Sequence, residues 1–337
     1  MGRDLTLHPG KASKKELASY LKRLGFVKCD HLWDWPEGTL NFHWFDSHEF
    51  RSITGVEADV FPVKGDELLI AGNPWALHVR NTYSASWHDV WMLNEVLRGA
   101  RKQFGGTIEG DYGTNRYAPL WEDASTPIGR GLSAAYQRVS CSISEVKYSL
   151  PASQIEKRNI NNNEIIDFVN SNDPMRVLYN GLVPFAVAMF EFFFAEAFEI
   201  LLEFDQEAQI KKTNYRQKVD FSVLVEVANS ERTIENVIAS NYTFQNLNQL
   251  NKAYKDWLGI DVRKVLYKKK KVGNSISFLE NRISEIIQYR HGIVHGFEID
   301  RSLNQEKYEA ILTAIEMAIG EFIGFVEKKY DVIVERY

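Results

Sequence analysis

The chain has 337 residues, which is enough for two domains of ordinary size. Its formal net charge of −5 provides no general attraction to nucleic acid, so any contact with RNA must come from a local patch. Two cysteines, Cys29 and Cys141, make no disulfide framework and indicate a reducing, cytoplasmic setting, and the first residues lack the apolar run of a signal peptide.

The N-terminal part of the chain predicts a sheet with two helices. Residues 1–121 hold seven of the eight tryptophans and six of the eight histidines, so composition alone separates this part from the rest. Ser13 and Glu16 have the spacing of a capping box and predict a helix start, and a second helix is predicted from about Trp87 to Gln103. Strand-like runs lie at 27–35, 40–45, 53–63, 68–71 and 76–83, and the glycine-rich segment 104–117 is expected to return as a last strand. The prediction is an α+β domain over residues 1–125, with an antiparallel sheet on one side and two helices on the other.

A change of composition follows this domain. Residues 126–162 are rich in Ser, Thr, Gly, Pro and Asn, and they predict a connecting region that can include short helix or strand. From 163 to 337 the chain has helical periodicity nearly throughout, so an all-α bundle is expected. Its helices are expected at about 164–172, 174–204, 206–217, 219–229, 232–239, 243–258, 274–296 and 304–329.

The segment 182–204 is apolar enough to imitate a membrane span. It contains Glu191, Glu196, Glu199 and Glu203, and a charged residue near the centre of a span costs about 3 kcal/mol. We therefore expect a core helix, and no membrane as a partner.

The most unusual stretch is 275–297, which predicts one amphipathic helix. At about 100° per residue, its apolar face gathers Ile276, Leu279, Ile283, Ile286, Ile287 and Val294. Arg290 projects from the middle of this face, where an unpaired buried charge costs several kcal/mol. A carboxylate, a bound anion or a partner subunit must therefore meet its guanidinium.

The end of this predicted helix resembles the signature of the HEPN superfamily. The likeness is carried by Tyr289-Arg290-His291-Gly292-Ile293-Val294-His295-Gly296. An arginine is followed by a polar residue and then, five positions after the arginine, by a histidine, in a neighbourhood that is helical throughout. His291 stands where an asparagine is commoner in the branch that this chain most resembles. The resemblance covers the C-terminal half and implies a HEPN-like helical bundle over residues 163–337 that dimerises through this helix.

In the HEPN ribonucleases that this chain resembles, such an arginine and histidine cut RNA without a metal or another cofactor. The resemblance therefore makes Arg290 and His295 the candidate catalytic residues. An imidazole can act as base or acid on the ribose 2′-OH, and a guanidinium can stabilise the charge of the phosphorane. Five positions on a helix correspond to about 140°, so either Gly292 loosens the last turn or two copies of the motif meet across a dimer. The structural alternative is that Arg290 forms a salt bridge inside the bundle and that the helix C-terminus favours His295.

Two further residues are candidates for auxiliary roles. His291 shares a helix face with His295 and is expected to contact phosphate or the partner subunit, because no third residue has a spacing that would complete a metal site. Glu191 lies on the apolar side of its own predicted helix. We expect it either to orient Arg290 or to reach the edge of the bundle.

The densest basic run lies directly before the motif helix and consists of Lys268, Lys269, Lys270 and Lys271. Such a run can follow an RNA backbone, or it can be a solvated loop. The histidines of the N-terminal part show no metal-site spacing, and the aromatic residues of 33–45 fit sheet packing better than stacking on RNA bases. We expect neither a metal nor a cofactor.

The expected function is a metal-independent endoribonuclease that leaves 2′,3′-cyclic phosphate and 5′-hydroxyl ends. By resemblance it would be an RNA-cleaving homodimer that acts in a toxin–antitoxin or anti-phage defence system. The N-terminal domain would sense a trigger, hold the substrate, or bind a regulatory protein or ligand. One alternative is a non-catalytic HEPN scaffold that dimerises and binds RNA, nucleotide or protein. Another is a nuclease gated by a cyclic-nucleotide messenger, against which the lack of a recognisable phosphate loop counts.

Overall fold

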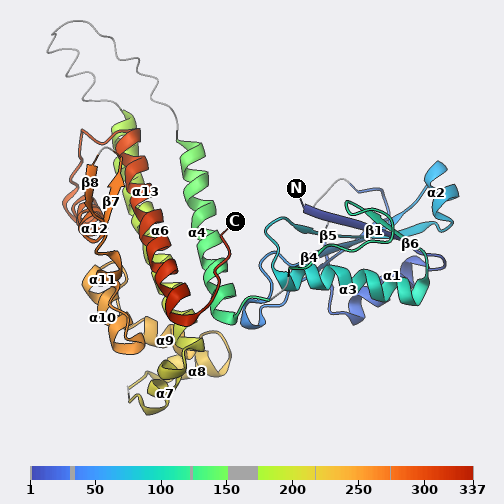
Figure 1. Ribbon diagram of the computed structural model, residues 1–337, viewed down its shortest axis with the longest axis horizontal. Coiled ribbons are helices and arrows are strands. Elements are labelled where there is room, and N and C mark those ends of the chain that lie inside the picture. Colours follow the sequence, from blue (N-terminus) through green and yellow to red (C-terminus); the bar gives the residue numbers. More distant parts are fainter. Residues whose placement is uncertain are drawn as a thin grey trace, which may run out of the picture. The chain divides into compact units, whose positions relative to one another are not determined.

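The computed structural model describes residues 2–30, 35–121, 124–150, 174–216, 218–273 and 275–336. Contacts within the chain divide it into two compact units, Met1–Arg130 and Gly131–Arg336 (Figure 1). The first unit is an α+β domain and the second is mostly helical, which confirms the predicted fold class.

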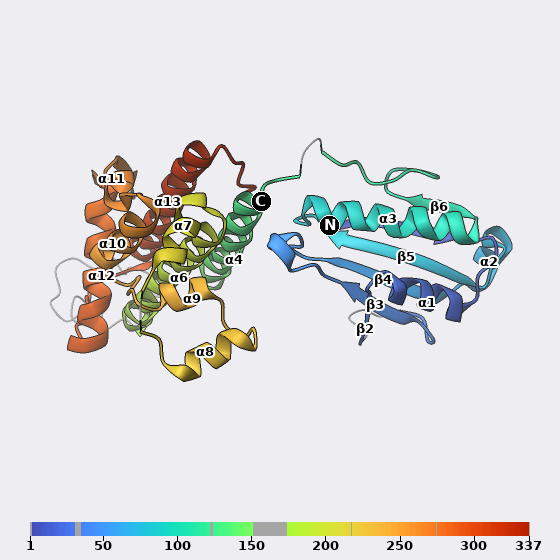
Figure 2. The ribbon, with the colours of Figure 1, turned by 90° about the horizontal axis from the view of Figure 1, so that it is seen from below.

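The first unit is built on an antiparallel sheet with the strand order β2-β3-β4-β5-β1-β6. Its strands are β1 (Gly2–His8), β2 (Val27–Cys29), β3 (Leu40–Trp44), β4 (Val56–Pro62), β5 (Trp75–Thr82) and β6 (Thr107–Gly110). The helices α1 (Lys14–Arg23) and α3 (Trp87–Phe104) lie on one face of this sheet, as the sequence predicts (Figure 1, Figure 2).

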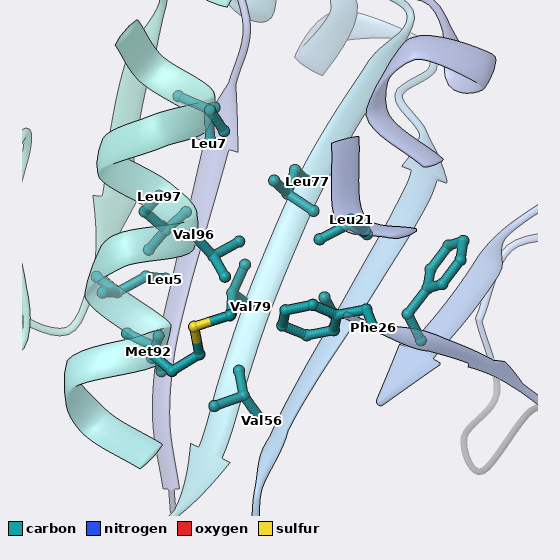
Figure 3. Close-up of a cluster of buried hydrophobic side chains, with 14 of the residues drawn as sticks. Leu5, Leu7, Leu21, Phe26, Val56, Leu77, Val79, Met92, Val96 and Leu97 are labelled. Atoms are coloured by element: carbon teal, nitrogen blue, oxygen red, sulfur yellow. The ribbon is translucent and has the colours of Figure 1, made fainter. Parts of the chain in front are cut away.

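The core of this unit lies between the sheet and the two helices. Successive side chains of a strand point to opposite faces, and the side facing α1 and α3 buries Leu5 and Leu7 of β1, Val56, Ala58 and Val60 of β4, and Leu77 and Val79 of β5. Burying one such aliphatic side chain stabilises the fold by about 1.5–3 kcal/mol. Figure 3 shows part of this core, with Leu5, Leu7, Leu21, Phe26, Val56, Leu77, Val79, Met92, Val96 and Leu97 labelled.

Capping boxes begin both helices. At α1 the Ser13 hydroxyl accepts the Glu16 N–H, and the Glu16 carboxylate accepts the Ser13 N–H at 2.8 Å, as predicted. Ser86 and Asp89 form the same pair at α3. Asp89 is fully buried, and its Oδ2 also accepts the N–H groups of residues 53 and 54, at 3.1 and 3.2 Å. One buried carboxylate thus ties the start of α3 to the segment that precedes β4.

A short 3-10 turn, η1 (His48–Phe50), holds Glu49 and Phe50 at φ values of 50° and 55°, in the left-handed region. Such a conformation costs about 1–3 kcal/mol for a residue other than glycine. The buried Arg130 holds it in place, because its Nε donates to the Glu49 carbonyl at 2.9 Å and its Nη2 lies 3.5 Å from the Glu49 carboxylate. Burial lowers the pKa of Arg130, and the Glu49 charge opposes this effect.

One element of the first unit differs from its prediction. Residues 68–71 belong to α2 (Asp66–Ala71), a short helix, where a strand was expected. Gly65 is its N-cap, and Gly72 is its C-cap with a φ of 68°, a left-handed conformation that glycine adopts without strain. Four apolar residues fit either structure, and the flanking glycines decide for the helix. Of the expected strand at 27–35 the structure shows β2, while residues 31–34 lie outside the described residues.

The second unit contains the long helices α4 (Pro127–Ser149), α6 (Pro174–Phe204), α12 (Leu279–Gly296) and α13 (Gln305–Tyr330), among which α6, α12 and α13 pack on one another (Figure 1). Helix α4 occupies much of the expected connecting region, 126–162. The remainder of that region beyond residue 150, and the helix expected at 164–172, lie outside the described residues. The shorter helices are α7 (Gln206–Asn214), α8 (Phe221–Ala228), α9 (Ile234–Ala239), α10 (Leu247–Leu258) and α11 (Val262–Leu266).

Aromatic side chains fill the centre of this bundle. The rings of Phe194 on α6 and Phe322 on α13 have centroids 4.9 Å apart, and Tyr254 of α10 packs on Phe322 at 5.2 Å. The Tyr254 hydroxyl donates to the Phe194 carbonyl at 2.7 Å, so its polar atom is satisfied in the core.

Helix α6 is the core helix that its four glutamates predict. Glu196 pairs with Arg138 of α4 at 2.5 Å, and Glu199 accepts a hydrogen bond from Asn236 at 3.1 Å. Among the helices in the described parts of the chain, none has an apolar run long enough to cross a membrane.

The stretch 275–297 is not one helix. Residues 275–278 form strand β8 (Ser275–Phe278), which pairs in antiparallel register with β7 (Lys269–Val272), and α12 begins only at Leu279. The prediction of a helix over 274–296 is therefore wrong at its start, because these residues use their backbone hydrogen bonds for a partner strand. Lys269, Lys270 and Lys271 consequently lie in a strand, where a loop was one expectation.

Candidate functional site

The predicted catalytic residues lie on the last two turns of α12. Arg290 is half-buried, while His291 and His295 are exposed. The helix continues without a break to Gly296, and the N–H groups of Phe297 and Glu298 both donate to the Gly292 carbonyl. This cap ends the helix in an ordinary way, so Gly292 does not loosen the turn that separates Arg290 from His295.

The Arg290 guanidinium forms no hydrogen bond or ion pair with any other described residue. The salt bridge that the structural alternative requires is thus not among the contacts of the described residues. Glu191 is also half-buried, and burial raises the pKa of its carboxyl group, whereas a hydrogen bond from Gln245 and the charge of Arg290 act to lower it. Glu191 therefore lies within the electrostatic reach of Arg290 and is hydrogen-bonded to another residue.

His291 and His295 lie side by side at the C-terminal end of α12. Their ring centroids are 4.4 Å apart, with an angle of 45° between the ring planes. Across the described residues, no group of three His, Cys, Asp or Glu side chains could hold a metal ion. Two exposed imidazoles at this helix end can exchange protons with a bound substrate.

A buried amide that sequence patterns did not indicate positions the motif. Asn180 of α6 is almost fully buried, and its Oδ1 accepts hydrogen bonds from the Tyr289 hydroxyl and from the Asp300 N–H. Its Nδ2 donates to the carbonyls of Arg176 and Asp300, at 2.6 and 3.0 Å. Asn180 thus joins the residue next to Arg290 and the segment after α12 to a single point of α6. An amide in an otherwise apolar stretch of the sequence was the one signal for it.

The four predicted RNA-binding lysines divide into two groups. Lys268 and Lys270 both pair with Glu321 of α13, and these hydrogen bonds lower the pKa of the Glu321 carboxyl group. Lys269 and Lys271 form no ion pair with any described residue, and both are exposed. The structure therefore leaves two of the four charges available for a ligand.

A second polar cluster lies on the face of the N-terminal sheet opposite α1 and α3. Asn41 donates to Asp59 Oδ1 at 2.6 Å, Asp59 Oδ2 lies 3.4 Å from His78 Nδ1, and His78 Nε2 lies 3.3 Å from Asp4 Oδ1. The Trp35 ring covers His78, with centroids 5.2 Å apart. Strand alternation places Asp4, Asn41, Asp59 and His78 on one face, but their pairing depends on a strand order that the sequence does not state. The network satisfies the buried Asp59, which is a structural role.

Between α1 and α3 the first unit also has an open depression of about 760 Å³. The residues that line it include Trp44, Trp91, Glu95 and Lys102. The surface that lines it is mostly apolar.

Comparisons with protein-family models, with curated proteins and with solved structures find no significant match for this chain.

Proposed function

We propose that this chain is a metal-independent endoribonuclease of the HEPN type. The observation that carries the proposal is the combination, on the last two turns of α12, of an exposed His295 with an Arg290 guanidinium that has no acceptor among the described residues. An imidazole open to solvent can exchange a proton with a substrate, and a guanidinium without a carboxylate partner is available to phosphate.

In the proposed reaction, His295 accepts the proton of a ribose 2′-OH, and the 2′ oxygen attacks the adjacent phosphorus. The bond from phosphorus to the 5′ oxygen breaks, and that oxygen takes a proton from an imidazolium group. Arg290 stabilises the extra negative charge on the phosphorane. The products are a 2′,3′-cyclic phosphate and a 5′-hydroxyl end, and no step uses a metal or a cofactor.

The proposed active site contains two copies of α12. Because this helix is unbroken, positions 290 and 295 of one chain are separated by about 140° around its axis. Helix α6 exposes Val177, Phe185 and Phe192, and Phe297 after α12 is 86% exposed. Exposed apolar side chains in such numbers are typical of interaction surfaces, and they support a homodimer.

The biological role proposed here follows from the resemblance alone: an RNA-cleaving effector of a toxin–antitoxin or anti-phage defence system. We place it in the cytoplasm, where the free thiols of Cys29 and Cys141 would stay reduced. The N-terminal domain would sense a trigger, hold the substrate, or bind a regulatory protein or ligand.

The competing proposal is a non-catalytic scaffold that dimerises and binds RNA, nucleotide or protein. Its support is that Asn180, Tyr289 and Asp300 give the end of α12 a structural role that needs no catalysis. In a scaffold, His295 would be dispensable.

The test is cleavage of an end-labelled single-stranded RNA in the presence of EDTA. It compares the wild type with Arg290→Ala, His295→Ala and the control Arg282→Ala, which removes an arginine from the same helix. We expect each of the first two substitutions to lower the cleavage rate about 100-fold or more, because each removes a group that acts in the transition state. The control should cut at the wild-type rate.

Circular dichroism and sedimentation first establish that every variant folds and associates as the wild type does. Cleavage that survives both substitutions would refute the assignment of the motif. Binding of RNA without cleavage by any variant would favour the scaffold.

A further inference from the structure

The hairpin β7–β8 presents aromatic rings and free charges on one surface. The rings of Tyr267 and Phe278 are stacked, with centroids 4.2 Å apart and an angle of 9° between their planes. The Lys269 ammonium lies 5.4 Å from the Phe278 ring centroid. Tyr267 is 61% exposed, so its ring remains open to a further stacking partner. These three residues are called the hairpin stack below.

The charges around the hairpin stack are not neutralised. Lys269 and Lys271 are exposed and form no ion pair within the described residues, in contrast to Lys268 and Lys270, which share Glu321. Alternation along β7 separates the two kinds of lysine, because Lys269 and Lys271 project from one side of the strand and Lys270 from the other. The side with the free ammonium groups is therefore the side on which an anionic chain would be attracted.

We propose that this surface binds single-stranded RNA, with one unpaired base stacked on Tyr267 and with phosphates beside Lys269 and Lys271. The inference rests on the proposed function for the identity of the ligand, since it specifies how the substrate of that nuclease is held. Stacking needs a base whose face is open, which a single strand offers and a duplex does not.

The position of the hairpin in the chain suits this role. Phe278 immediately precedes α12, and Arg290 follows eleven residues after Leu279. At 1.5 Å per residue this corresponds to about 16 Å along the helix. A strand of a few nucleotides can span such a length, so the same RNA can occupy the hairpin stack and reach the motif.

The experiment measures binding separately from cleavage. Full-length protein carrying His295→Ala is titrated against a fluorescein-labelled single-stranded RNA and against the same sequence as a duplex, with fluorescence anisotropy as the readout. We expect Tyr267→Ala to weaken binding of the single strand about fivefold or more, and Tyr267→Phe to leave it unchanged, because loss of one base–aromatic stack has effects of this size. Tyr148→Ala, which removes another exposed tyrosine, is the matched control and should bind like the parent.

The salt dependence of binding tests the lysines. Each phosphate contact contributes about 0.7 to the slope of log affinity against log salt for a single strand, so Lys271→Ala should reduce the slope by about that amount. Lys268→Ala removes a lysine of the same hairpin that Glu321 already neutralises, and it should leave the slope nearly unchanged.

Equal binding by the parent and Tyr267→Ala, a duplex bound as tightly as the single strand, or no RNA binding would each overturn the proposal. The outcome is distinguishable from the fate of the nuclease. Cleavage that needs Arg290 and His295 but is unaffected by Tyr267→Ala would refute the hairpin stack alone. Tyr267-dependent binding by a wild type that never cuts would refute the nuclease alone.

Discussion

Among single residues, Asn180 is predicted to affect both the stability of the bundle and the candidate site, although it bears no charge. Replacing it with alanine removes the oxygen to which the half-buried Tyr289 hydroxyl and the Asp300 backbone N–H both donate. An unsatisfied buried group costs about 1–3 kcal/mol, so Asn180→Ala should lower the free energy of unfolding by about that amount. Urea unfolding followed by circular dichroism measures it.

Cleavage by the Asn180→Ala variant should fall as well, under conditions in which the protein remains folded. The reason is that Tyr289, which Asn180 holds, is the residue before Arg290. The control is Asn214→Ala, because Asn214 is exposed at the end of α7. An unfolding free energy of Asn180→Ala equal to that of the control would contradict the assigned role.

The surroundings of single motif residues were predictable only where the geometry of their own helix determines them. Because Arg290 projects from an apolar helix face, its guanidinium was not expected to be fully solvated. In the structure the residue is half-buried. The partner of Glu191 was not predictable, because Gln245 is 54 positions away in the sequence and lies in the turn before α10, to which no helical periodicity connects α6. The same reason hid the role of Asn180, because Tyr289 and Asp300 follow it by more than a hundred residues.

At the scale of elements, Glu321 links the hairpin to α13 in a way that depends on pH. Its pKa lies below the ordinary value because Lys268 and Lys270 donate to the carboxylate. A carboxyl group with a lowered pKa contributes stability above its unfolded-state pKa, and this contribution is lost as the pH falls through the folded-state value. Glu321→Gln should therefore be less stable than the wild type at pH 7, by less than about 1 kcal/mol for an ion pair that water reaches.

The difference between wild type and Glu321→Gln should disappear at a pH well below 4. Urea unfolding at a series of pH values measures it, with Glu145→Gln on the exposed side of α4 as the control. A difference that stays constant between pH 7 and pH 3 would show that the ion pairs with the two lysines do not cause it.

Elements were predictable where local chemistry is decisive and not where it is ambiguous. The Ser13–Glu16 capping box correctly placed the start of α1, because both of its hydrogen bonds are formed within four residues. Residues 275–278 were predicted to be helical because Ile276 falls in phase with the apolar face of α12. They pair with β7 instead, because the chain turns at the glycine at position 273, whose φ is 56°. Turn chemistry outweighed helical periodicity there.

At the scale of the whole molecule, we predict how two copies of the chain associate. If the exposed apolar residues of α6 form the interface of a homodimer, Phe185→Asp should place a charge in it and shift the protein to a monomer. Phe185 is 63% exposed, so the substitution leaves the core of each bundle intact. Sedimentation velocity measures the change, and cleavage should be lost together with the dimer.

Leu69→Asp is the control for Phe185→Asp, since Leu69 is an exposed leucine on α2 in the N-terminal unit. A wild type that sediments as a monomer at concentrations at which it cuts RNA would remove the dimer from the mechanism. So would a Phe185→Asp variant that remains a dimer.

The division into an α+β part and a helical part was predictable from composition, because tryptophan and histidine gather in the first 121 residues. That residues 127–149 form a long helix was not predictable in this way. Its serines and glycines resemble a linker, but Leu132, Ala135, Val139 and Ile143 recur at helical spacing and are buried. Small residues in this helix allow close packing, so polar composition alone was a poor guide.

Helix α4 limits where the gene of such a protein could recombine to exchange one domain for another. Its first turn carries Arg130, which holds the left-handed turn at Glu49, while its later turns bury apolar residues in the bundle. A recombination joint after residue 162 would leave the helical unit without α4. A joint before Thr126 would remove Arg130 from the turn at Glu49. A recombination event that leaves both units intact must therefore join the two sequences within about one helical turn of Gly131. This narrow window makes it difficult for evolution to combine the helical unit and the N-terminal domain with other domains independently.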